Sequence, residues 1–453
     1  MNPEFERNLW LELTPRRQVG LALTLGLILG AAWMLGHGEP HKLAAAMSAT
    51  GFAIYIACGL IWTARAAGGS VLEEIRGRTW DFQRLSAISP WAMTWGKLFG
   101  AAGLAWIGAL VGLFVGGAAL AQLVDTSDAA LLVLGLLAMT VFFQACAMGA
   151  ALVGVRKARA EGRVATGGAV LVGVLGGLFL LSSLSQHLPG AGRHWAGHMG
   201  QASPHAPINV WGQEIDGALF AAASAWLFAA WAVVGAWRLM RLELQMKNSP
   251  WTWLAFLVFA AVWRAGLANP LEGGLGRALA GGVVLAGLTY AAAFVEPADP
   301  VRLRRFWAAL HAGRLGEAVG GAPAALFALA LTVLAAIAAM ALPRGDVGQP
   351  PAPIAILAAL VFLIRDLGVI TFFRFGPQPS RGDLSTVIAL VLLYAVGAVI
   401  DQTLGARVGV VLFSPLLTYA PLSILVSGVV QAAAAWVLAS HRLTGPAPPP
   451  NPA

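Results

Sequence analysis

The sequence predicts an all-α polytopic membrane protein with about 12 transmembrane helices and an N-terminal interfacial helix. Apolar residues make up 58% of the chain and charged residues 11%, and the mean hydropathy is +0.74. A soluble domain carries about a quarter charged residues. Apolar runs of about 20 residues recur along the chain, and each can cross a hydrocarbon core ~30 Å thick. Helices are favoured because they satisfy their own backbone groups in lipid.

Residues 1–17 predict the interfacial helix. Asn2 followed by Pro3 is typical of a helix start, because proline fits the first helical position. The apolar side chains that follow fall on one helix face, and they are Phe5, Leu9, Trp10 and Leu13. Such a stretch is expected to lie in the membrane surface.

Residues 18–240 contain the first six predicted spans and residues 249–440 the other six. The first six are Val19–Gly36, Leu43–Thr63, Leu98–Leu120, Ala129–Val153, Val164–Leu184 and Ala218–Trp237. The second six are Trp251–Leu267, Ala278–Val295, Ala322–Leu342, Ile354–Phe373, Leu384–Ile400 and a last one that ends near Ala439.

The last span has an irregular pattern. Pro415 and Pro421 interrupt Val408–Ala439, which favours a broken or re-entrant element followed by Leu422–Ala439. The tail Gly445–Ala453 is Pro-rich and is predicted to be disordered.

The distribution of basic residues predicts the orientation. With both termini in the cytoplasm, 23 of the Lys and Arg residues fall inside and 6 outside. This bias predicts a multi-pass protein of the bacterial inner (plasma) membrane with cytoplasmic N- and C-termini and an even number of spans. The net charge of +8 is therefore assigned to topology and not to nucleic-acid binding. Cys58 and Cys146 lie within apolar spans, a pattern typical of neither a disulfide framework nor a metal site.

The polar segment Arg65–Lys97 separates the second and third spans and has an apolar face. Its motif runs from Glu73-Glu74 through Gly77-Arg78-Thr79 and Asp81 to Gly96-Lys97, which begins 17 residues after Thr79. This order resembles the first cytoplasmic loop of ABC type-2 permeases, the membrane subunits of one class of ATP-binding-cassette exporters. The shared layout covers roughly residues 1–240, and the motif covers about 25 residues. Arg78 interrupts the Gly-Thr of the family, and Pro90 stands later than the family's proline.

The resemblance implies coupling to a separate cytoplasmic ABC ATPase. The residues expected to contact it are Glu73, Glu74, Asp81 and Arg84 as rim charges, Thr79 of the motif, and Trp80 and Phe82 as apolar anchors. The alternative is an interfacial helix whose aromatic side chains lie among lipid headgroups. The pattern G-x-x-x-x-G-K-[ST] is absent from the sequence, so ATP and Mg²⁺ are expected on the partner. The chain itself is then a permease and not an enzyme, and it binds no cofactor.

The third span carries glycines on one helix face. They are Gly96, Gly100, Gly108, Gly112 and Gly116. Glycines at such spacing let another backbone approach, which predicts tight packing inside the chain or an interface with a second subunit. The second half has a cytoplasmic segment of its own, Glu296–Glu317. A diverged internal repeat, a second permease chain and a homodimer are therefore all open.

Other polar residues define the alternative functions. The outer loop contains His187, His194, His198 and His205. His194 and His198 are four residues apart, a spacing at which one helix face can present both to a metal. The surrounding sequence favours ordinary loop histidines. Within the spans, Arg365-Asp366 is predicted to form a self-neutralising pair. An ion- or proton-coupled carrier would need more acids at mid-membrane depth, and a membrane-embedded lipid-modifying enzyme would need a convergent polar set. Membrane lipids are expected partners, and the spans are compatible with lipid, drug, peptide or polysaccharide substrates.

Overall fold

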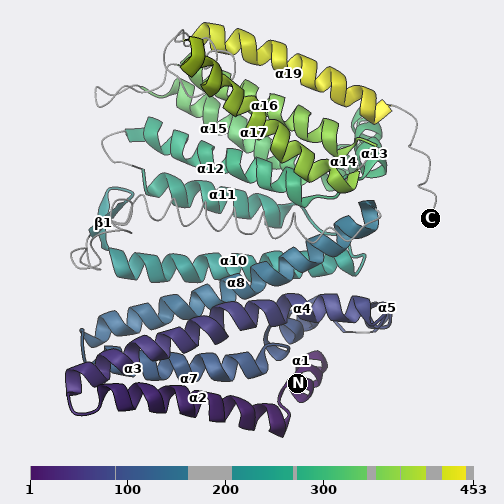
Figure 1. The fold of residues 1–453 in the computed structure, drawn as a ribbon. Coiled ribbons are helices and arrows are strands. Elements are labelled where there is room, and N and C mark those ends of the chain that lie inside the picture. The colour runs from purple at the N-terminus through teal and green to yellow at the C-terminus, as the bar shows by residue number, and fades with distance from the viewer. Residues whose placement is uncertain are drawn as a thin grey trace. The chain divides into compact units, whose positions relative to one another are not determined.

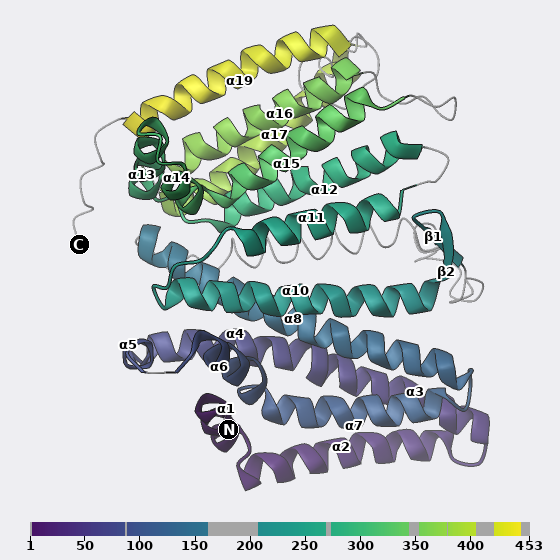
Figure 2. The same cartoon turned by 180° about the vertical axis from the view of Figure 1, so that it is seen from behind.

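A computed structural model describes residues 2–86, 88–161, 207–268, 273–343, 353–377, 379–404 and 421–444 (Figure 1). Among these residues the chain forms two compact units. Unit 1 is built mainly from residues 2–155 and 214–248, and unit 2 from residues 156–161 and those after 248. Each unit is a bundle of long helices, as the opposite view also shows (Figure 2).

Unit 1 begins with α1 and contains most of the described first half. Its helices are α1 (Pro3–Glu12), α2 (Pro15–Gly36), α3 (Pro40–Tyr55), η1 (Ile56–Trp62), α4 (Thr63–Arg76), α5 (Trp80–Arg84), α6 (Pro90–Trp95), η2 (Gly96–Gly100), α7 (Gly103–Leu120), α8 (Thr126–Glu161) and α10 (Gly217–Glu243). The last residues of α8 belong to unit 2. Before α10 the chain forms a short hairpin of two strands, β1 (Pro207–Val210) and β2 (Gln213–Asp216).

Unit 2 contains the second half. Its helices are α11 (Trp251–Gly266), α12 (Gly273–Val295), α13 (Pro300–His311), α14 (Leu315–Gly321), α15 (Ala324–Ala341), α16 (Pro353–Arg374), α17 (Pro379–Leu404) and α19 (Pro421–Thr444). The short helices α13 and α14 lie between two long ones, and they pack on each other through Phe306, Ala309 and Ala318.

Within the described ranges, nine helices are long and apolar enough to cross a membrane, which confirms an all-α polytopic membrane protein. Two further predicted spans are helical: α11 has 16 residues and α17 has 26. The predicted span Val164–Leu184, the interrupted stretch before Pro421 and the Pro-rich tail lie outside the described residues.

The second predicted span is longer than its apolar stretch. It was expected to end at Thr63, but α3, η1 and α4 form one continuous helix of 37 residues from Pro40 to Arg76. The middle part, η1, is a π-helix, and a second π-helix, η2, joins α6 to the start of the third span. Such wide turns are rare and are frequently found at functional sites. The polar segment Arg65–Lys97 is largely helical.

Proline-led caps fix where several helices begin. Asn2 accepts a hydrogen bond from the Glu4 amide, and Pro3 follows it, as the sequence predicted. Asp299 repeats this arrangement before Pro300 and caps α13. A side-chain oxygen at this position satisfies amides that the first helical turn leaves free, and proline has no amide to satisfy.

The glycine face of the third span packs inside unit 1. Gly96 and Gly100 face α1, and the other three face α3 and η1. Gly51 of α3 lies against both Gly112 and Gly116 of α7, and a Cβ on Gly112 would lie 2.7 Å from the Gly51 carbonyl oxygen. The two backbones can cross there only because none of these residues has a side chain.

The two units repeat one order of elements. In unit 1, α2 and α3 come first, the short helices α5 and α6 follow, and α7 packs back on α3. In unit 2, α11 and α12 come first, α13 and α14 follow, and α15 packs back on α12. This shared order is what a duplicated six-span half produces.

The glycine crossing yields the first prediction. Gly112→Ala places a methyl group against the backbone of α3, so we expect a loss of about 2 kcal/mol or more in stability, as for other overpacked sites. Gly26→Ala is the matched control, because a Cβ there meets nothing within 4 Å. The control should gain up to about 1 kcal/mol from the better helix former. Thermal unfolding of both variants in one detergent measures the difference, and equal melting temperatures would contradict the crossing.

Candidate functional site

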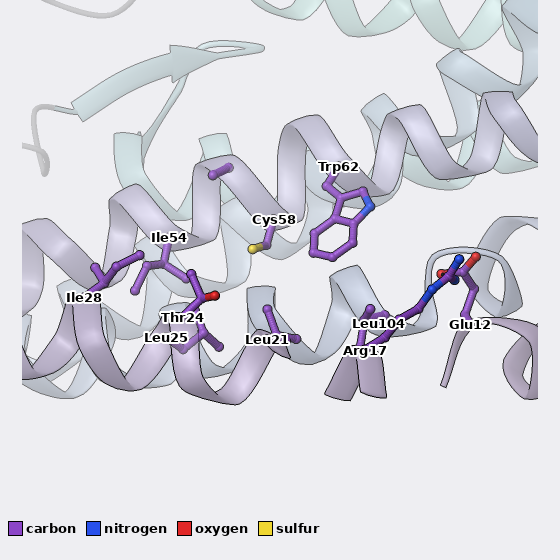
Figure 3. Close-up of a pocket in the computed structure, with 11 residues that line it drawn as sticks. Glu12, Arg17, Leu21, Thr24, Leu25, Ile28, Ile54, Cys58, Trp62 and Leu104 are labelled. Atoms are coloured by element: carbon purple, nitrogen blue, oxygen red, sulfur yellow. The ribbon is translucent and has the colours of Figure 1, made fainter. Parts of the chain in front are cut away.

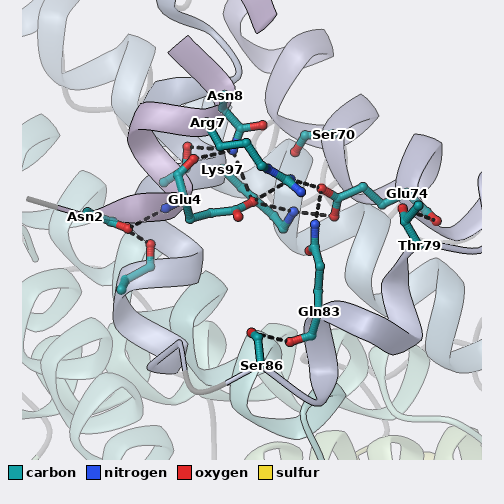
Figure 4. A network of polar contacts seen from close by, with 12 residues as sticks. Asn2, Glu4, Arg7, Asn8, Ser70, Glu74, Thr79, Gln83, Ser86 and Lys97 are labelled. Carbon is teal, nitrogen blue, oxygen red and sulfur yellow. Dashed lines mark hydrogen bonds and ion pairs between the residues drawn. The ribbon is translucent and has the colours of Figure 1, made fainter. Parts of the chain in front are cut away.

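Lys97 lies in η2 with no exposed side-chain surface. Its Nζ contacts the Glu4 carboxylate of α1 at 2.9 Å and also bonds the Glu74 carboxylate of α4 (Figure 4). A buried ammonium is costly unless carboxylates and hydrogen bonds surround it. The two acids therefore make this burial tolerable, and they join three segments that are distant in sequence.

Three further side chains complete the group. Arg7 bonds both Glu4 and Glu74, and Gln83 donates to Glu74 at 2.6 Å. Asn8 donates to the Glu4 backbone oxygen at 2.8 Å and to its carboxylate at 3.1 Å. We refer to Glu4, Arg7, Asn8, Glu74, Gln83 and Lys97 as the lysine cluster. It contains two acids and two bases, so its formal charge is zero.

The cluster adds polar contacts to the interfacial helix expected at α1. Its sequence predicts a helix lying on the membrane through an apolar face, and the buried side chains of α1 in the structure are Glu4 and Asn8. Trp10 points outward and is 83% exposed. The helix is therefore held against unit 1 by polar contacts, and Trp10 is left on the outer face.

Trp80 was expected as an exposed anchor, and the structure corrects this placement. Its indole is 2% exposed and packs with Met93, Leu98 and Met240 in the core of unit 1. Its Nε1 donates to Glu243 at 3.2 Å, and Lys97 Nζ lies 5.5 Å from the ring centre. The residue therefore positions α5 from within.

The outer side of α5 is apolar at its centre and charged at one edge. Phe82 is 78% and Leu85 86% exposed, although both are large apolar residues. Asp81 is 82% exposed and pairs with Arg84 at 3.5 Å. Trp80 anchors α5 in the core of unit 1, so the exposed side chains of Phe82 and Leu85 are held in a fixed position.

The remaining motif residues divide between surface and interior. Glu73 and Thr79 are exposed, whereas Glu74 is only 14% exposed and belongs to the lysine cluster. Glu74 was expected as a rim charge at the surface, but it is an internal charge that pairs with Lys97. Arg78 has a positive φ of 55°, in the turn that ends α4, and Thr79 N bonds Glu74 O at 3.0 Å. The glycine of the motif is thus followed by an arginine that takes the left-handed position.

Unit 2 contains a second buried polar group. Arg365 Nε donates to Asp366 at 2.8 Å, which confirms the predicted self-neutralising pair. Tyr290 and Tyr394 donate to the other carboxylate oxygen at 2.6 and 2.7 Å, and Arg365 also donates to Gln431 at 2.9 Å. These bonds join α12, α16, α17 and α19 through groups that lipid cannot solvate.

Sequence reasoning missed both tyrosines and Glu243. The one signal in the sequence is that tyrosine is rare, with only 4 in the chain. Two of these four contact Asp366 in the structure. The four outer-loop histidines, which the sequence favours as ordinary loop residues, lie outside the described residues. Across the part of the chain that the structure does describe, no group of three or more His, Cys, Asp or Glu side chains is placed to hold a metal ion.

No family model, curated protein or solved structure matches this chain. The likeness to ABC type-2 permeases therefore rests on the motif residues alone.

The lysine cluster yields the second prediction. Lys97→Met leaves two acids facing one arginine, so we expect a loss of about 3–5 kcal/mol, typical of a broken buried pair. Adding Glu4→Gln should recover part of that loss, because it removes one uncompensated charge. The measurement is thermal unfolding in detergent.

Lys42→Met is the matched control. Lys42 pairs with Glu39 at 2.7 Å, but both side chains are more than half exposed. An exposed pair contributes at most about 1 kcal/mol. If Lys97→Met destabilised the protein no more than Lys42→Met, the cluster would not stabilise unit 1.

Proposed function

We propose that the chain is the transmembrane subunit of an ATP-driven ABC exporter, coupled to a separate cytoplasmic ATPase through α5. The observation that carries the proposal is the exposure of Phe82 on α5 and of Leu85 directly after it, on a helix fixed from within by Trp80. Exposed aromatic and aliphatic side chains on a rigid support are typical of interface anchors. ATP and Mg²⁺ would bind the partner, and this chain would convert closure of the ATPase into helix movement.

The connections of α5 support a mechanical role. On its N-terminal side, only a tight turn separates it from α4, which continues through η1 into the second span. On its C-terminal side, α6 continues through η2 into the third span. Glu74 and Lys97, one from each side, bond each other directly. A push on α5 would therefore act on two spans at once, with the lysine cluster keeping their ends together.

The alternative role for the aromatic residues applies better to α6 than to α5. Trp91 and Trp95 are 47% and 43% exposed and lie beside η2, where the third span begins. Tryptophans at that level are typical of the membrane interface. Phe82 and Leu85 precede them in a segment that carries acidic and basic neighbours, as the rim of a protein interface does.

The twelve-span topology belongs to the same proposal. The nine apolar spans of the described residues, together with α11, α17 and Val164–Leu184, make twelve. In unit 1 the end that carries α1 and α5 is basic, with Arg7, Arg76 and Arg84 among its residues. The positive-inside rule supports a cytoplasmic position for that end, and the proposal takes the membrane to be a bacterial inner membrane.

Unit 2 carries a comparable surface on α13 and α14. Trp307 and Leu315 are 48% and 65% exposed. Arg302 fixes the pair by donating to Glu296 at 2.9 Å and to the Ala322 carbonyl at 3.0 Å. With the repeated order of elements, this favours one chain that supplies both halves of the exporter over a homodimer or a second permease chain.

An ion-coupled carrier is the second candidate, and one observation bears on it. Asp366 is a buried acid within a span, as a coupling site requires. Arg365 and two tyrosines already occupy its oxygens, however, so an ion would have to displace them. This arrangement fits a bond between helices better than an ion site. A lipid-modifying enzyme has less support, because among the described residues we find no cluster of polar side chains arranged to act on a lipid.

The third prediction tests the docking surface. The double change Phe82→Asp and Leu85→Asp should lower the affinity for a co-expressed ABC ATPase about tenfold or more, as loss of interface anchors does. Neither side chain is part of the core, so the fold should persist. Affinity is measured by co-purification and titration in detergent.

Met246→Asp is the matched control, because Met246 is 46% exposed but lies outside the segment. It should bind the ATPase as the unchanged protein does. Undiminished binding of the double variant would reject α5 as the docking helix.

The fourth prediction tests the internal repeat. If one chain supplies both halves, native mass spectrometry should find two ATPase chains for each permease chain. Trp307→Asp with Leu315→Asp should reduce this to one, because only α5 remains intact. A complex with two permease chains and two ATPase chains would instead identify a homodimer.

A further inference from the structure

A groove of roughly 700 Å³ runs along α2 in unit 1 (Figure 3). One wall is a single face of α2, made of Arg17, Leu21, Thr24, Leu25 and Ile28. The opposite wall comes from α3, η1 and α7, through Ile54, Ala57, Cys58, Trp62 and Leu104. Its volume is within the range of small-molecule sites, ~300–1,000 Å³.

The two ends of the groove differ in polarity. Glu12 and Arg17 stand together at one end, with Arg17 Nη1 3.0 Å from the Glu12 carboxylate. Figure 3 shows the Trp62 ring and the Cys58 thiol reaching toward α2 in the apolar part. Thr24 is the single polar side chain there, and its hydroxyl donates to the Gly20 carbonyl of its own helix. The groove thus has a charged mouth and an apolar slot.

The length of the slot matches one membrane leaflet. Arg17 and Ile28 are 11 residues apart on α2, which corresponds to roughly 16 Å at the rise of an α-helix. Half of a bilayer core ~30 Å thick is about the same. A chain held in the slot would therefore span the distance from a headgroup to the middle of the membrane.

The π-helix shapes the inner wall. Three lining residues, Ala57, Cys58 and Trp62, belong to η1. A π-turn widens the helix locally and is frequently found at functional sites. The small side chains Ala57 and Cys58 leave the slot open, while Trp62 stands toward the charged mouth, where its ring can contact a lipid near its glycerol.

We infer that this groove binds one glycerophospholipid with a phosphoethanolamine headgroup. One of its two acyl chains fills the slot, the phosphate pairs with Arg17, and the ammonium pairs with Glu12. The exposed pair between Glu12 and Arg17 contributes little by itself, so a zwitterion of matching polarity replaces it at small cost. The inference is independent of the exporter assignment, since it needs only unit 1.

The experiment uses the full chain, delipidated in mild detergent and titrated with phosphatidylethanolamine. Native mass spectrometry should show one retained lipid. Phosphatidylcholine, whose amine donates no hydrogen bond, and phosphatidylglycerol, which has no amine, should bind about threefold to fivefold more weakly, as expected for loss of one exposed charged contact. Glu12→Gln should abolish this preference, and Arg17→Gln should weaken all three lipids.

The slot is tested separately from the mouth. Ala57 is exposed in the groove, so Ala57→Phe should fill the slot and abolish lipid retention without altering the core. Ala53→Phe, at an exposed position that does not line the groove, and Arg16→Gln are the controls and should retain the lipid. Equal retention by Ala57→Phe and Ala53→Phe would overturn the site. Equal affinity for the three lipids in the unchanged protein would overturn the headgroup assignment.

Discussion

The arrangement of unit 1 depends on the burial of the Lys97 ammonium. Its side chain has no exposed surface, and two carboxylates from α1 and α4 neutralise it. Because a lone buried charge is strongly unfavourable, the three segments are stable in this geometry only together. Trp80 and Gln83 then place α5 against the same group. The exposed apolar surface of α5 is a consequence of this internal electrostatic constraint.

Unit 2 follows the same order of elements but places its buried charges elsewhere. Its ion pair lies within a span, where Arg365 and Asp366 bond three other helices. Its short helices are held by Glu296, which accepts hydrogen bonds from Arg302 of α13 and from the amide of Ala324 at the start of α15. A duplicated framework therefore needs no residue identity between the halves, because different ion pairs can fix equivalent helix packings. The two halves thus share an order of helices without sharing the ion pairs that hold them.

Composition and span length were enough to predict the fold class, and Asn2-Pro3 was enough to predict where α1 begins. The interior of the site was not predictable in the same way. In a helix of only five residues, the sequence does not show whether Trp80 or Phe82 is buried. The packing of α10 against Trp80 decides this. Glu4 and Asn8 look solvent-exposed until Lys97 is known to lie beside them. Whether these side chains are buried depends on partners that are distant in sequence. Neither hydropathy nor motif spacing identifies those partners.

The two π-helices have a mechanical consequence of their own. A π-turn holds one more residue than the α-turn it replaces, so shifting it along the chain twists everything beyond it about the helix axis. Because η1 lies between α3 and α4, and η2 between α6 and α7, a shift of either π-turn by one residue would rotate the helix that follows it about its axis. Straight α-helices have no extra residue whose position could change in this way.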